Sequence, residues 1–99
     1  MASLTEITPA KIEKYLDLTN RAIAKTTIVA PGRSYAVKIA ENFLGMAKSY
    51  LADAEHNHGK GDFVNAFAQV NYAHGWLDAG ARLGVFDVGE DDVLFTLLE

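Results

Sequence analysis

The chain has 99 residues, no cysteine and a net charge of −4, which allows one modest hydrophobic core and is too little for two. The absence of cysteine excludes disulfides, zinc–thiolate sites and thiol nucleophiles, and it suits a reducing cytoplasm. The nine lysines and arginines are scattered instead of forming a basic stripe, so nucleic acid is not an expected partner.

The N-terminus and the hydropathy of the chain bear on its location. Residues 1–6 lack the basic region and the apolar core of a signal peptide. No apolar run approaches the roughly 20 residues that span a bilayer. We therefore expect a cytoplasmic protein that does not bind membranes.

The first predicted helix covers about residues 9–27. Thr8 is suited to cap it, because its hydroxyl accepts a hydrogen bond from an orphan amide, and Pro9 is favoured at the first helical position. The apolar stripe that follows recurs every three or four positions and consists of Ile12, Leu16, Thr19, Ile23 and Thr26. Pro31 and Gly32 then predict a turn.

The second predicted helix covers about residues 34–58, with Ser34 as its cap and Gly59 at its end. Two adjacent apolar seams run along it and together take up about half of its circumference. They consist of Val37, Ala40, Leu44, Ala47, Leu51 and Ala54, and of Ala36, Ile39, Phe43, Met46 and Tyr50. Such a helix contacts two neighbours at once, as a three-helix bundle requires.

The third predicted helix covers about residues 62–83, between an Asp62 cap and a Gly84 stop. Its core seam consists of Ala66, Val70, Ala73, Leu77 and Gly80. The loop before it is short, so this helix folds back against the second. The predicted fold is all-α, an antiparallel up-and-down three-helix bundle that forms one domain over residues 1–99, with a short apolar C-terminal tail packed on it.

The outer side of the third helix is poor in charge. Val64, Ala68, Gly75 and Ala79 lie where charged residues are expected, and Arg82 is the charged residue on that side. Gly75 and Gly80 each cost roughly 1 kcal/mol relative to alanine within a helix. The close approach of another backbone is the simplest reason for these glycines.

The tail, residues 85–99, combines large apolar residues with an excess of acids. Residues 87–99 carry five acidic side chains and no basic one. Acids before an apolar run indicate a short helix, whereas alternating Val93, Phe95 and Leu97 indicate an extended segment, and both alternatives stay open. We expect the tail, or a second copy of the chain, to cover the outer side of the third helix, so a homodimer through helix 62–83 and the tail is a predicted assembly.

Several motifs resemble a known family. They are the run from Lys60 to Phe67, the run from Asn71 to Gly84, the segment Tyr50–Ala54 and the tail residues Leu94–Thr96. Together they resemble an uncharacterised archaeal family, domain of unknown function 357. The resemblance covers most of the chain and implies a small up-and-down three-helix bundle, but it implies no activity.

One polar stripe on the third helix is the best candidate for chemistry. Asn71, His74, Asp78 and Arg82 lie at helical spacing along one edge. An aspartate one turn from a histidine orients it and raises its basicity, as in a general base. The competing interpretation, which we favour, is a hydrogen-bonded set that ties the third helix to the first or to the tail.

Other candidates are binding residues. Tyr72 and Trp76 lie one turn apart and, with Arg82, are candidates for contacts with a partner or a ligand. His56 and His58 point about 200° apart on a helix, so they do not chelate one ion. We predict no metal and no cofactor.

These observations favour a non-enzymatic protein-interaction or self-associating helical module with an unknown protein partner. The alternative is a small-molecule-binding protein or an enzyme that uses Asn71, His74 and Asp78. A pocket that joins those three side chains would favour the alternative.

Deletion of residues 88–99 is predicted to lower stability or to change the oligomeric state. Each large apolar side chain of the tail that is buried contributes roughly 1.5 to 3 kcal/mol. Thermal melting and sedimentation measure the two effects. Identical results for the full and shortened chains would contradict the prediction.

Overall fold

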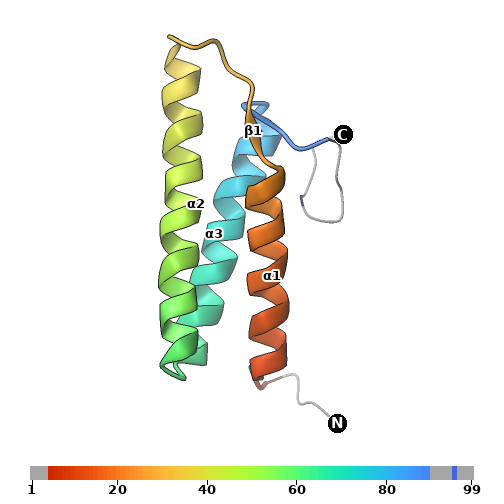
Figure 1. Cartoon of the computed structure of the whole chain (residues 1–99), viewed down its shortest axis with the longest axis vertical. Coiled ribbons are helices and arrows are strands. Elements are labelled where there is room, and N and C mark those ends of the chain that lie inside the picture. Colours follow the sequence, from red (N-terminus) through yellow and green to blue (C-terminus); the bar gives the residue numbers. More distant parts are fainter. Residues whose placement is uncertain (1–4, 90–94, 96–99) are drawn as a thin grey trace.

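In the described part of the chain, three helices run up, down and up along the bundle (Figure 1). The computed structural model describes residues 5–89 and 95. Helix α1 covers Pro9–Lys25, α2 covers Tyr35–Gly59 and α3 covers Phe63–Leu83. This arrangement confirms the predicted all-α three-helix bundle.

Side-chain caps begin all three helices. Thr8, Ser34 and Asp62 each accept a hydrogen bond at 3.2 Å from the backbone amide three residues further on. The amide side chain of Asn65 also donates to Asp62, at 2.7 Å. These two bonds, first the one from the Asn65 side chain and then the one from its backbone, lower the pKa of the Asp62 carboxyl. The capping pattern in the sequence therefore predicted the helix starts correctly.

The end of α1 differs from the sequence prediction. The helix stops at Lys25, and Thr26 is already extended, with φ −76° and ψ 128°. Strand β1, Thr27–Ile28, pairs antiparallel with β2, Phe86–Asp87, so that Ile28 lies opposite Phe86. The β-branched residues after Lys25 favour this extended pairing over another helical turn. The described start of the tail is therefore extended.

The core consists of two clusters of buried side chains. The cluster toward the α2–α3 loop holds Ile12, Leu16, Leu51, Ala54, Ala66, Val70 and Ala73. The cluster toward the strands holds Ala22, Ala40, Ala47, Leu77, Val85, Phe86, Val88 and Phe95. Four members of the second cluster come from the tail, so the described tail residues pack on the bundle as expected.

The two helical glycines of α3 have different surroundings. A Cβ atom at Gly80 would overlap the ring of Phe86, whereas a Cβ atom at Gly75 would meet nothing within 4 Å. The group that approaches Gly80 is thus an aromatic side chain and not the expected backbone. Gly75 has no such neighbour among the residues that the structure describes.

The outer side of α3 is not covered by the described part of the tail. Val64, Ala68, Gly75 and Ala79 are all exposed. The tail side chains are instead buried beside Gly80 and in the cluster near the strands. The prediction that the tail covers the outer side of α3 is therefore wrong for residues 85–89 and 95. Residues 90–94 and 96–99 lie outside the described residues.

Alanine substitutions at the two glycines of α3 should have opposite effects on stability. Gly80→Ala forces the Phe86 ring out of its place and should cost about 1 to 3 kcal/mol, as overpacking does. Gly75→Ala meets no neighbour and should gain up to about 1 kcal/mol from helix propensity. Urea unfolding in dilute solution measures both. Equal changes in the free energy of unfolding for the two variants would show that the place of the Phe86 ring does not require a glycine at position 80.

Candidate functional site

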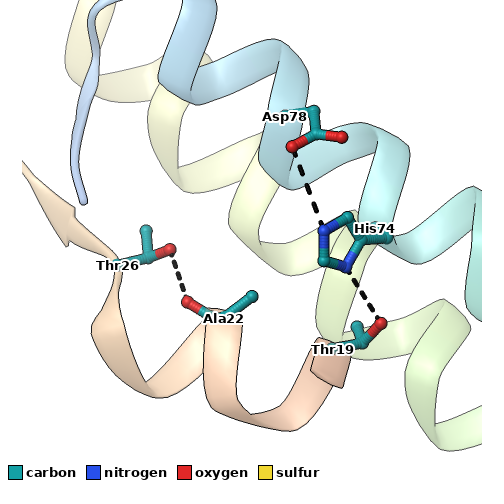
Figure 2. Close-up of polar contacts among 5 residues, drawn as sticks. All are labelled: Thr19, Ala22, Thr26, His74 and Asp78. Carbon is teal, nitrogen blue, oxygen red and sulfur yellow. Dashed lines mark hydrogen bonds and ion pairs between the residues drawn. The ribbon is translucent and has the colours of Figure 1, made fainter. Parts of the chain in front are cut away.

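A polar link joins α3 to α1 near the middle of the bundle (Figure 2). The hydroxyl oxygen of Thr19, on α1, lies 3.1 Å from His74 Nδ1, on α3. On the other side of the ring, His74 Nε2 lies 3.9 Å from an oxygen of Asp78, one helical turn further on. The imidazole thus stands between a hydroxyl and a carboxylate.

The order hydroxyl, imidazole, carboxylate is that of a catalytic triad. However, the burial of the Thr19 hydroxyl argues against that chemistry. Thr19 is 1% exposed, and a nucleophile must reach its substrate. The ring of Phe95 also lies over this region, with its centroid 6.2 Å from that of His74. His74 is therefore placed to hold α1, α3 and a tail residue together.

The other two members of the predicted stripe do not join this link. The Asn71 side chain donates to the backbone carbonyl of Phe67 within α3, at 3.0 Å, and it is exposed. Arg82 is exposed as well. The structure thus brings His74 and Asp78 together and leaves Asn71 and Arg82 on the surface.

The predicted aromatic pair on α3 belongs to a larger aromatic set. Tyr72 and Trp76 have ring centroids 5.9 Å apart, at 82°. Across the α2–α3 junction, Tyr50 lies 4.5 Å from Tyr72 and Phe43 lies 5.1 Å from Trp76, again edge to face. The sequence assigned Phe43 and Tyr50 to a core seam. Their helical spacing shows that Phe43 and Tyr50 lie on the same side of α2. It does not show that they contact Tyr72 and Trp76 on α3.

This aromatic set is only partly buried. Tyr72 is 51% exposed, and the other three rings are half-buried. The indole nitrogen of Trp76 is buried and has no hydrogen-bond partner among the described residues. A hollow of about 210 Å³ on α2 adjoins the set at Phe43, and it is lined by Tyr35, Lys38, Ile39, Asn42 and Phe43. This hollow contains none of the three residues of the predicted pocket.

A mostly apolar surface runs along α3 beside the aromatic set, with Arg82 as the charged residue on the same side. We call it the outer face of α3, and it consists of Val64, Ala68, Tyr72, Gly75, Ala79 and Leu83, all exposed. The spacings of three and four residues place these positions along one side of the helix. The three large side chains are 51% to 72% exposed. The sequence showed four of these positions, but it did not show that Tyr72 and Leu83 continue the same face.

The described part of the chain shows neither a metal centre nor a membrane-spanning helix. No group of three His, Asp or Glu side chains within it could hold a metal ion. None of its helices combines the length and the apolarity needed to cross a bilayer.

The fold and these surfaces define a small three-helix bundle with a polar interhelix link and a mostly apolar outer face on α3. Residues 14–86 match the sequence profile of a family described as "Protein of unknown function (DUF357)". The chain belongs to this family, as its motifs predicted. No curated protein and no solved structure matches the chain.

The link between Thr19 and His74 should appear as a coupling energy in a double-mutant cycle. Thr19→Val keeps the shape of the side chain and removes its hydroxyl, and His74→Ala removes the ring. We expect the two effects on unfolding to be non-additive by about 1 kcal/mol, the net value of one hydrogen bond.

Thr26→Val is the matched control for this cycle. The Thr26 hydroxyl donates to the Ala22 carbonyl of its own helix, at 2.9 Å (Figure 2). Its effect should add to that of His74→Ala without coupling. Full additivity for Thr19 as well would mean that the contact at 3.1 Å contributes nothing to stability.

Proposed function

We propose that this chain is a non-enzymatic protein-interaction module that docks partners on the outer face of α3. The observation that carries this proposal is the exposure of Val64, Tyr72 and Leu83, at 72%, 51% and 58%. The positions between them are alanine or glycine. A contiguous apolar surface on a small protein is typical of an interaction site.

The contrast with α1 supports this proposal. The solvent side of α1 carries charged residues, among them Lys11, Glu13, Asp17 and Arg21, and all four are exposed. The six residues of the outer face of α3 are uncharged, and the exposed Arg82 is the charged residue beside them on that side. A face that only meets water gains solubility from charges, so their replacement by apolar groups along five turns favours a docking role.

The aromatic set supplies anchors for such a surface. The Tyr72 ring contacts the edges of Tyr50 and Trp76, so it loses little conformational freedom when a partner covers it. Tyrosine and tryptophan are the residues that most often dominate binding energy at protein interfaces. The small residues Ala68, Gly75 and Ala79 beside them allow a partner helix to come close.

The enzymatic alternative has less support. It requires Asn71, His74 and Asp78 to converge on a pocket, whereas Asn71 bonds within its own helix and His74 contacts the buried Thr19. The expected cytoplasmic location and the identity of the partner stay predictions. Cell fractionation and the following experiment test them.

Photo-crosslinking from two positions tests the docking role. A photoactivatable phenylalanine analogue replaces Ala79, on the outer face of α3, or Ala52, which is exposed on α2. We expect covalent protein adducts in native cells from position 79, at several times the yield from position 52. Gel mobility and mass spectrometry measure the adducts. Equal yields from the two positions would contradict a docking role for this face.

A further inference from the structure

We infer that a second copy of this chain binds the outer face of α3, with the two α3 helices packed antiparallel. This inference rests on the proposed function and names its partner. Three properties of the face support it, namely the order of its residues, the shapes of its two central residues and its low charge.

The order of residues along the face is symmetric. Its positions are 64, 68, 72, 75, 79 and 83, so the spacings read four, four, three, four, four in both directions. A twofold axis between Ala73 and His74 therefore places every position of the face opposite another position of the face. Closed dimers need this property, because residue i must meet j while j meets i.

The residues that this axis pairs have compatible sizes. Val64 lies opposite Leu83 of the partner subunit, so the two ends of the face pair large apolar groups. Ala68 lies opposite Ala79 of the partner subunit, which lets the two helix axes approach closely. Tyr72, the largest residue, lies opposite the partner's Gly75, the smallest.

The shapes at the centre of the face fit this register. Tyr72 stands half exposed, and its ring is fixed by edge contacts with Tyr50 and Trp76. A Cβ atom at Gly75 would meet nothing within 4 Å, so no described residue of the chain itself requires a glycine there. Glycine lowers helix stability relative to alanine. The open space over Gly75 fits a tyrosine ring of a second copy.

Charge and size favour a second copy over a charged partner. A strongly charged surface would lose hydration against this face, beside which Arg82 is the charged residue on the same side, whereas the same face of another copy carries equally little charge. The 21 residues of α3 offer a strip about 30 Å long and about 12 Å wide. Two such strips bury roughly 700 Å² in total, which is below the size of a standard specific interface. The dimer is therefore reversible.

Cysteine crosslinking tests the register, because the natural chain has no thiol. Ala68→Cys and Ala79→Cys are prepared separately and then oxidised alone or as an equal mixture. Antiparallel packing brings positions 68 and 79 within disulfide distance, so the mixture should form the mixed dimer several times faster than either variant alone. Ala52→Cys, on exposed α2, is the control and should crosslink only at the rate of random encounter. Faster pairing of Ala68→Cys with itself would overturn the antiparallel register.

Sedimentation of a matched pair of glycine variants tests the face itself. Gly75→Leu fills the space assigned to Tyr72 of the partner subunit and should weaken self-association at least tenfold. Gly45→Leu, an exposed position on α2 where a Cβ atom also meets nothing within 4 Å, should leave self-association unchanged. Circular dichroism checks that both variants keep the helical fold.

The outcomes separate this inference from the proposed function. If the natural chain stayed monomeric at millimolar concentration, a second copy would be excluded as the partner. If the two leucine variants changed dimerisation equally, the outer face of α3 would be excluded as the interface. Adducts from position 79 that contain a different protein would then leave the docking role standing with another partner. Equal adduct yields from positions 79 and 52 would overturn both.

Discussion

The packing of α3 against both other helices is the constraint on which the rest of the structure depends. Ala66, Ala73 and Gly80 on its core seam are small, so α1 and α2 come close to it on two sides. Its core side is thereby covered by α1 and α2, and the opposite side faces outward. The polar link from His74 to Thr19 and the aromatic contacts to α2 lie at the two edges of this core side. The outer face of α3 is what the bundle leaves uncovered.

The ring of Phe86 determines where the described tail residues lie. It occupies the space above Gly80, and pairing of Phe86–Asp87 with Thr27–Ile28 holds it there. These contacts close the end of the bundle at which α1 and α3 finish (Figure 1). They also bury Val85 and Val88 within the chain. The described tail is thus used in the core, which explains why it does not shield the outer face of α3.

Local signals in the sequence predicted the fold, whereas contacts between distant residues escaped prediction. Caps and apolar periodicity located all three helices, because both depend on neighbours within a few residues. The sequence placed the end of α1 too late, because the strand that competes with its last turn lies about 60 residues away. Gly75 and Gly80 look equivalent in sequence, and only the position of Phe86 distinguishes them. For the same reason the sequence left open whether His74 meets α1 or the tail; Thr19 and Phe95 both lie beside it.

Association through the outer face of α3 is the proposal on which the dimer depends. Backbone amide and methyl chemical shifts recorded over a hundredfold range of protein concentration test it most directly. We expect concentration-dependent shifts at the positions of the outer face of α3, with little change on the charged side of α1. These positions are Val64, Ala68, Tyr72, Gly75, Ala79 and Leu83. Shifts confined to the paired strands, or spectra that do not depend on concentration, would contradict it.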